Sequence, residues 1–194
     1  NNTKSKDYGK LKDLMRPGHA DYTGKIRYNG FNDYRGGGHF SGRITAPLVF
    51  AGAICKQILE AKGIKIVSHI KSIGTIEDKS FLDEEITEDF INSYMLKELP
   101  LIDGSKEEDM RKEILLAKEE LDSIGGTVEC AVLGIEPGIG NPFFDSVEST
   151  LAHLMFSIPA VKGIEFGLGF GFASKKGSEV NDPFEINEGK VDIV

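Results

Sequence analysis

A short segment near the start of the chain combines arginine, histidine and aspartate in a pattern that could move a proton beside an anion. It reads Arg16-Pro-Gly-His-Ala-Asp-Tyr-Thr23, and it places His19 in a Pro-Gly loop between a guanidinium and a carboxylate. An imidazole exchanges protons near neutral pH while a neighbouring arginine holds an anion. A single loop histidine is more often incidental, so the pattern alone leaves both interpretations open.

A second candidate segment reads Arg35-Gly-Gly-Gly-His-Phe-Ser-Gly-Arg43 and stands directly before an apolar stretch. Three consecutive glycines let the backbone approach a flat or phosphorylated ligand, and a following helix N-terminus presents unpaired N–H groups. Arg35 and Arg43 flank the glycines with forked donors suited to carboxylate or phosphate. No Walker sequence follows, and a tight structural turn explains the composition almost as well.

The remaining glycine clusters are poorer candidates for a nucleotide site. Gly138 and Gly140 separate a predicted strand from a predicted helix, but Phe143 stands where the dinucleotide fingerprint needs its third glycine. Another set alternates along a predicted strand and indicates a bare sheet face packed closely against another segment. Its members are Gly167, Gly169 and Gly171.

The charge distribution favours a small anion over nucleic acid as a ligand. Residues 1–43 hold nine Lys or Arg against four Asp, so this stretch carries +5 while the whole chain carries −8. Nucleic-acid binding rests on broad phosphate neutralisation, which an acidic protein with one basic segment does not supply. With 194 residues, 40% of them apolar, and no apolar run of roughly 20 residues, we expect one globular domain outside the membrane.

The cysteines and the chain ends add further expectations. Cys55 and Cys130 have neither the number nor the spacing of a disulfide framework or a metal clip, which predicts buried free thiols, a reducing cytoplasmic setting and no metal. The chain starts at Asn1 without Met, and it stops within an alternating pattern that ends at Val194. We therefore expect both ends to be cuts in a longer chain.

Hydrophobic periodicity predicts the elements that must position the two candidate segments. Residues 10–38 are predicted to be loop, with a short strand around 26–28. Residues 45–61 are apolar nearly all round and predict a buried core helix. Alternation over 64–76 and 127–135 predicts two half-buried strands, and the first of these contains a histidine for which the sequence offers no partner.

Capping patterns predict two helices later in the chain. Ser105 with Glu108 begins an amphipathic helix, and Asp145 with Glu148 begins a second. Residues 161–173 are predicted to form a strand, as is the end of the chain, while 77–103 is acidic and predicted irregular. This order favours an α+β fold, a layered sandwich with helices packed against antiparallel sheets. A parallel doubly wound sheet is the alternative.

Long collinear motifs in this chain resemble chorismate synthase. The similarity runs through essentially the whole sequence and comprises RPGHADYTG at Arg16–Gly24, GGGHFSGR at Gly36–Arg43, EPGIGNPFFDSVESTLAHLMFSIPAVKGIEFGLGF at Glu136–Phe170, SKDY at Ser5–Tyr8 and GSEVNDPF at Gly177–Phe184. The resemblance implies that residues 1–194 form a single partial domain, truncated at both ends. It also implies a layered α+β sandwich that is a homotetramer when intact.

The resemblance implies an enzyme of the shikimate pathway of aromatic amino-acid biosynthesis. Members convert 5-enolpyruvylshikimate 3-phosphate to chorismate by eliminating phosphate, using reduced FMN without net redox change. The flavin could be reduced by a partner or by an intrinsic NADPH-dependent activity. The family places a second catalytic histidine before Asn1 and further site segments after Val194, so the chain alone is expected to be inactive. The alternative is a non-catalytic module that binds an anion or a nucleotide.

The resemblance also assigns roles to residues. His19 matches the histidine that protonates the reduced flavin, and Arg16 and Arg43 would bind the substrate, whose phosphate and two carboxylates suit guanidinium groups. The flavin-contacting triplet of the family, commonly Arg-Ser-Ser, falls on residues that retain only the final serine. These are His39, Phe40 and Ser41.

Two further positions depart from the family pattern. Ile44 stands where the family commonly has Glu, and Leu48 stands where it usually has Arg. The second change removes one candidate anion contact from the predicted substrate site.

Overall fold

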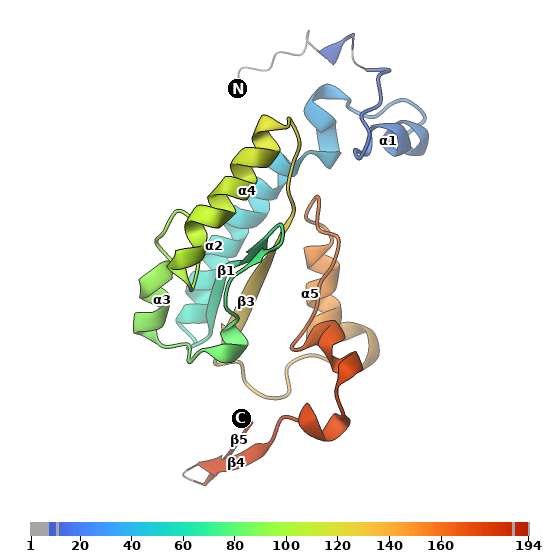
Figure 1. The fold of residues 1–194 in the computed structure, drawn as a ribbon. Coiled ribbons are helices and arrows are strands. Elements are labelled where there is room, and N and C mark those ends of the chain that lie inside the picture. Colours follow the sequence, from blue (N-terminus) through green and yellow to red (C-terminus); the bar gives the residue numbers. More distant parts are fainter. Residues whose placement is uncertain (1–7, 11, 188, 194) are drawn as a thin grey trace. The chain divides into compact units, whose positions relative to one another are not determined.

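The protein is described here by a computed structural model that covers residues 8–10, 12–187 and 189–193 (Figure 1). The chain divides into two compact units. One unit is Pro47–Gly138, and the other combines residues 1–46 with Ile139–Val194. Within the part of the chain that the structure describes, no helix is both long and apolar enough to cross a membrane.

A small antiparallel sheet lies at the centre of the Pro47–Gly138 unit. Its strands are β1 (Lys65–Ile73), β2 (Ile76–Glu77) and β3 (Gly126–Leu133), in the order β2-β1-β3. β1 pairs with β3 from Lys65 opposite Leu133 to Ile73 opposite Gly126. The two strands predicted from alternation are confirmed, as is the α+β class with helices against an antiparallel sheet.

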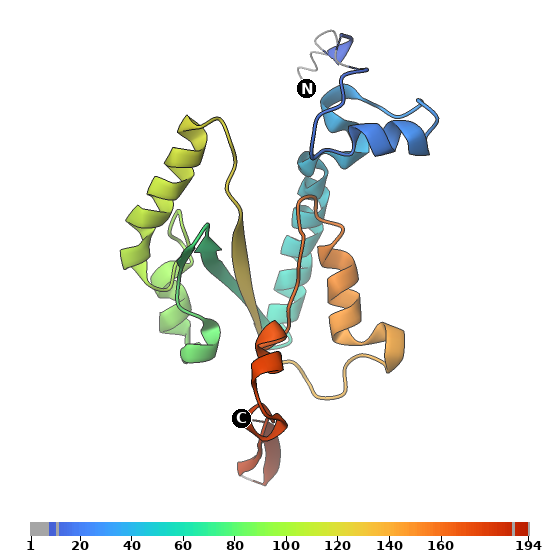
Figure 2. The same cartoon turned by 45° about the vertical axis from the view of Figure 1, so that its right-hand side comes forward.

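Three helices accompany this sheet: α2 (Ala46–Glu60), α3 (Glu88–Tyr94) and α4 (Glu107–Glu119). Figure 2 shows α3 and α4 on one side of the sheet and α2 on the other. The prediction of irregular structure is wrong where α3 forms, because Thr87 caps this helix by accepting the N–H of Phe90.

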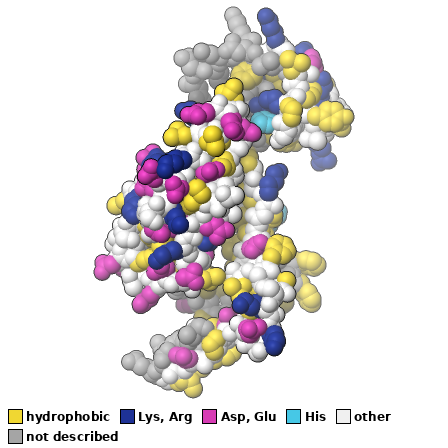
Figure 3. All heavy atoms as spheres, in the orientation of Figure 1, with side chains coloured by type: hydrophobic (Ala, Val, Ile, Leu, Met, Phe, Trp, Pro, Cys, Tyr) yellow, Lys and Arg dark blue, Asp and Glu magenta, His cyan; other side chains and the backbone are white. Residues whose placement is uncertain are grey.

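The predicted amphipathic helix is α4, and its outer face is charged (Figure 3). Ion pairs one turn apart line this face, for example Arg111 with Glu107 and Lys112 with Glu108. The start of the helix differs from the prediction, because the side chain of Asp103 accepts the N–H of Ser105 and caps the preceding turn.

The apolar core of this unit lies between the sheet and α3. One cluster of buried side chains comes from β1, from α3 and from the 3₁₀ turn that precedes α3. They are Val67, Phe81, Ile91 and Tyr94. Leu101 and Met110, the latter on α4, are also buried but do not belong to this cluster. Full burial of side chains of this size contributes about 1.5–3 kcal/mol each, so the core stabilises the unit substantially.

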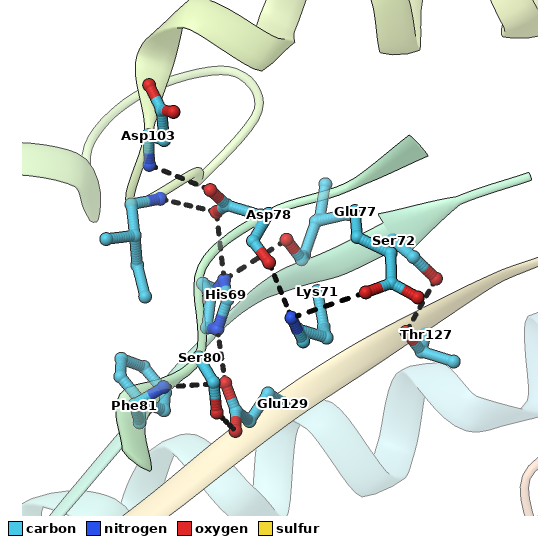
Figure 4. A network of polar contacts seen from close by, with 12 residues as sticks. His69, Lys71, Ser72, Glu77, Asp78, Ser80, Phe81, Asp103, Thr127 and Glu129 are labelled. Atoms are coloured by element: carbon cyan, nitrogen blue, oxygen red, sulfur yellow. Dashed lines mark hydrogen bonds and ion pairs between the residues drawn. The ribbon is translucent and has the colours of Figure 1, made fainter. Parts of the chain in front are cut away.

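A buried histidine crosses this core and joins three segments (Figure 4). Nδ1 of His69 lies 3.2 Å from Oδ2 of Asp78, and Nε2 lies 2.7 Å from Oε2 of Glu129. Nδ1 also lies 3.1 Å from the carbonyl oxygen of Ile70. The sequence offered no partner for His69, and the structure supplies two carboxylates and a carbonyl, with one of the carboxylates 60 residues away.

Both carboxylates are also hydrogen-bonded to backbone. Asp78 accepts the N–H groups of Ile102 at 2.6 Å and Asp103 at 2.8 Å. Glu129 accepts the N–H of Phe81 at 2.9 Å and the hydroxyl of Ser80 at 2.6 Å. Burial raises the pKa of Glu129, but its hydrogen bonds outweigh this effect and hold the pKa below its usual value.

The predicted core helix forms as α2, but its apolar side chains are exposed in this chain. The exposed fractions are 52% for Leu48, 69% for Val49, 72% for Phe50, 48% for Ile54 and 54% for Ile58. The prediction of burial is therefore wrong here, although the periodicity of the helix is correct. The prediction of buried thiols is also wrong, because Cys55 on α2 and Cys130 on β3 are free but exposed.

The other unit contains α1 (Asp21–Arg27), α5 (Val147–Met155) and a hairpin of β4 (Phe184–Asn187) with β5 (Lys190–Ile193). The hairpin confirms the strand predicted at the end of the chain, of which Val194 lies outside the described residues. The predicted helix after Asp145 is confirmed as α5, but Ser146 caps it by accepting the N–H of Ser149.

Two predictions in this unit are wrong. Residues 21–27 form α1 where loop and strand were predicted, because Asp21 in the first turn and Arg27 in the last complement the helix dipole. Residues 161–173 contain a 3₁₀ turn rather than a strand. Gly167 and Gly169 have φ of 56° and 53°, a left-handed conformation that no strand accommodates.

α1 packs against the side chain of Phe40, which follows the glycine triplet. Gly24 is the buried residue of α1, and a Cβ placed there would lie 2.6 Å from Cε2 of Phe40. The rings of Phe40 and Tyr28 are 6.4 Å apart between centroids. The absence of a side chain at Gly24 therefore permits this contact, which joins the two candidate segments.

We expect Gly24→Ala to destabilise α1 by about 1–3 kcal/mol, because the added methyl group overpacks against Phe40. In a Phe40→Ala background the same change should stabilise α1 by about 0.5–1 kcal/mol, since alanine favours helix. Gly52→Ala in α2, where a Cβ meets nothing within 4 Å, is the control and should stabilise in both backgrounds. Amide hydrogen exchange in each helix measures these changes, and an unchanged sign in the double variant would refute the contact.

We expect His69→Ala to lower the opening free energy of β1 and β3 amides by about 3–5 kcal/mol, because it leaves two carboxylates without their shared hydrogen-bond partner. Ser72→Ala is the matched control, since it removes a 2.7 Å hydrogen bond to Thr127 between the same strands at an exposed position. Its effect should stay near 1 kcal/mol. Equal effects of the two variants on hydrogen exchange would show that the contacts of His69 with Asp78 and Glu129 stabilise the strands no more than an exposed hydrogen bond does.

Candidate functional site

The loop that contains His19 is closed by the residues at its two ends. Oδ2 of Asp21 accepts the backbone N–H of Arg16 at 3.1 Å and its Nε at 2.8 Å, and Oδ1 accepts Nη2 at 3.0 Å. These hydrogen bonds from Arg16 lower the pKa of Asp21 to about 2. We call this arrangement the Arg16–Asp21 clasp.

His19 occupies the turn inside the clasp. Its backbone N–H donates to the carbonyl of Arg16 at 3.3 Å, and Gly18 before it has a φ of 73°, which favours glycine. The side chain of His19 is exposed. A titratable ring is therefore presented to solvent at the tip of a loop whose base is fixed.

The glycine triplet adopts a conformation that other residues rarely reach. Gly36, Gly37 and Gly38 have φ of 60°, 82° and 51°. A Cβ at Gly36 would lie 2.6 Å from Nη1 of Arg43, and one at Gly37 would lie 3.7 Å from Nη2 of Arg16. The two arginines therefore both approach the triplet, and the structure brings the two candidate segments together at this point.

Arg35 does not serve as a free anion contact beside the triplet. Asp33 accepts its backbone N–H at 3.1 Å, its Nε at 2.7 Å and its Nη2 at 3.0 Å, and these hydrogen bonds lower the pKa of Asp33 to about 2. The carbonyl of Arg35 in turn accepts Nη2 of Arg43 at 3.3 Å. Arg35 thus holds the backbone that leads into the glycines.

The side chains of the three residues after the glycines lie in different environments. His39 is exposed, whereas the ring of Phe40 is engaged with α1. Ser41 is half-buried, and its N–H donates to the carbonyl of Gly38 at 3.3 Å. A ligand at the triplet would therefore meet the side chains of His39 and Ser41 more readily than the Phe40 ring.

A cavity of about 460 Å³ opens beside the Arg16–Asp21 clasp. It lies within the size range of small-molecule sites. Its walls carry Lys12 and Lys25 as well as the clasp, and Lys25 pairs with Asp13 at 2.6 Å. Three cationic side chains and two carboxylates line the cavity, a net charge of +1, which is the sign that an anionic ligand would require.

Three other residues that the sequence singled out are exposed. Ile44 and Leu48 are 45% and 52% exposed, so apolar surface follows Arg43. His153 lies exposed on α5. In the described part of the chain, no group of three or more His, Cys, Asp or Glu side chains is arranged to hold a metal ion.

Sequence analysis missed the roles of Asp21 and Asp33. The signal was present in the spacing, because an aspartate five residues after Arg16 and one two residues before Arg35 are both within reach of a short loop. Both arginines were treated as available to a ligand, whereas each has two guanidinium nitrogens committed to a carboxylate.

Comparison with known proteins extends the likeness over the whole chain. The family model for chorismate synthase matches residues 1–192. Chorismate synthase of Pyrococcus abyssi is 51% identical over 185 residues, which cover 95% of this chain and 50% of that protein. The enzyme of Thermococcus kodakarensis is 44% identical over 184 residues, with the same coverage.

A solved structure agrees with the sequence relatives. A crystal structure of chorismate synthase superposes with a TM-score of 0.78 at 35% identity, over 88% of this chain and 54% of that one. The chain spans about half the length of the curated relatives it matches. A family match over nearly every residue, together with this shared fold, shows that the chain belongs to the chorismate synthase family.

Proposed function

We propose that the whole protein converts 5-enolpyruvylshikimate 3-phosphate to chorismate by eliminating phosphate in the presence of reduced FMN. Family membership supports the reaction type. The observation that carries the proposal to this chain is the convergence of Arg16 and Arg43 on one glycine triplet, beside the loop that presents His19. Arginine pairs at a bare backbone suit a substrate with a phosphate and two carboxylates.

The residues around the triplet fit a flavin. Gly36 and Gly37 leave the backbone bare, and a side chain at Gly36 would displace Arg43. Ser41 and His39 would contact the cofactor through side chains, and Phe40 through its backbone, since its ring packs against α1. Reduced FMN, when bound, would supply electron density to the substrate and recover it.

The arginines and His19 have separate tasks in this proposal. Arg16 and Arg43 bind the anionic groups of the substrate, and the Nη1 of Arg16 is not engaged by Asp21. His19 would donate and accept a proton at the cofactor through its exposed imidazole. General acid–base chemistry would require the imidazole to be within hydrogen-bond reach of the cofactor. The neighbouring carboxylate of Asp21 is paired with Arg16 and does not compete for that proton.

We also propose that the whole protein is a cytoplasmic homotetramer. The exposed apolar side chains of α2 support further packing by other segments or subunits, because soluble proteins rarely expose such patches. The free thiols of Cys55 and Cys130 support a reducing compartment. Because packing is incomplete in residues 1–194, we expect this chain alone neither to convert the substrate nor to bind FMN stoichiometrically.

A second function, a non-catalytic anion- or nucleotide-binding module, rests on the cationic cavity beside the Arg16–Asp21 clasp. The two functions differ in one simple observation. The enzyme releases chorismate and inorganic phosphate from the substrate, whereas a binding module retains the substrate unchanged.

We expect His19→Ala in the full-length protein to lower chorismate formation at least about 10²-fold, the usual loss for a positioned acid or base. His153→Ala, which removes an exposed histidine from α5, is the matched control and should stay within about twofold. The measurement is chorismate absorbance under anaerobic conditions with reduced FMN. Full activity of the His19 variant would remove this residue from the mechanism, and activity of residues 1–194 alone would show that the site is complete within them.

A further inference from the structure

Asp21 has more hydrogen bonds to Arg16 than a surface ion pair needs. Three donors of Arg16 converge on one carboxylate, the backbone N–H among them, and the aspartate side chain is 23% exposed against 52% for the arginine. Most surface ion pairs join two side chains only and contribute little. Because Asp21 also accepts the backbone N–H of Arg16, the pair closes the loop as well as pairing two charges.

The clasp fixes two groups of the proposed site at once. Its side-chain bonds hold the plane of the Arg16 guanidinium, whose Nη2 faces Gly37. Its backbone bond holds the start of the loop, whose carbonyl at Arg16 accepts the N–H of His19. Loss of the carboxylate would therefore release the guanidinium and the imidazole together.

We propose that Asp21 is a positioning residue for His19 and Arg16. It touches neither cofactor nor substrate in this assignment, and it acts by keeping the loop closed before either ligand arrives. Its effect on turnover rests on the proposed function, whereas its effect on the loop does not. A preformed loop lowers the conformational entropy that is lost on ligand binding.

A neighbouring ion pair provides a control that distinguishes the positioning role of Asp21 from the effect of its charge. Asp13 pairs with Lys25 at 2.6 Å and lines the same cavity, but among the described residues it accepts no backbone N–H and closes no loop around a histidine. Asp13→Asn and Asp21→Asn therefore remove the same charge from the same cavity. Only the second removes the clasp.

The first arm of the test measures the loop in residues 1–194 by NMR. In Asp21→Asn we expect the Arg16 amide to exchange at least tenfold faster and the His19 ring resonances to move toward those of an unstructured peptide. In Asp13→Asn both should match the parent chain. An Arg16 amide that exchanges equally in the two variants would overturn the proposal, whatever the protein catalyses.

The second arm measures steady-state kinetics of the full-length protein. We expect Asp21→Asn to lower kcat at least tenfold and to raise KM for the substrate severalfold, while affinity for FMN stays within twofold because the glycine triplet is intact. Glu108→Gln, which removes an exposed carboxylate paired with Lys112 on α4, should leave all three within twofold. Unchanged kcat in Asp21→Asn, or equal losses in both variants, would overturn the positioning role.

The two arms separate failure of the proposal from failure of the proposed function. A parent protein that makes no chorismate would refute the function, and the NMR arm would still decide the role of Asp21. If Asp21→Asn does not fold, Asp21→Glu carries the same measurements, since it retains the carboxylate on a longer arm. Faster Arg16 exchange and a partial loss of kcat are then expected, and parental values of both would overturn the proposal.

Discussion

Carboxylates that accept a backbone N–H and a side-chain donor at the same time fix the loops and the core of the described chain. Such a bond replaces the water that an amide would otherwise need, and the charge of the carboxylate makes it stronger than a neutral hydrogen bond. Four acidic residues share this arrangement, with arginine as the side-chain partner in two cases and histidine in the other two. They are Asp21, Asp33, Asp78 and Glu129.

In the Pro47–Gly138 unit this interaction organises the core. The buried His69 joins β1 to β3 and to the connection that carries Asp78, and every oxygen around it has further donors. Burying polar groups is costly unless they are hydrogen-bonded, and both ring nitrogens of His69 and both carboxylates have partners here. The residues near the glycine triplet use the same chemistry at the surface, where it shapes short loops instead of a core. The core and the proposed site therefore rest on one kind of contact in two dielectric environments.

Hydrophobic periodicity and motifs predicted the longer elements and the candidate site. The sequence did not predict contacts between residues far apart in the chain, or structure that depends on a single side chain. Alternation identified β1 and β3, and the apolar run identified α2. Alternation did not identify the hydrogen bond between His69 and Glu129, because that pairing depends on strand register across 60 residues. α1 is too short for a periodic signal. The alternating glycines after residue 166 imitate a strand, although the backbone of Gly167 and Gly169 is left-handed. The site motifs were recognisable, but only geometry shows that Asp21 and Asp33 already occupy two of the arginines.

Under the proposed function, these contacts preform one wall of the site, with His19 and Arg16 held beside the glycine triplet. The function is tested most directly by the stoichiometry of a single anaerobic turnover by the full-length protein with 5-enolpyruvylshikimate 3-phosphate and reduced FMN. We expect one chorismate and one phosphate for each substrate consumed, with all the flavin recovered in its reduced form. Release of phosphate without chorismate, or oxidation of one flavin for each substrate, would rule this function out.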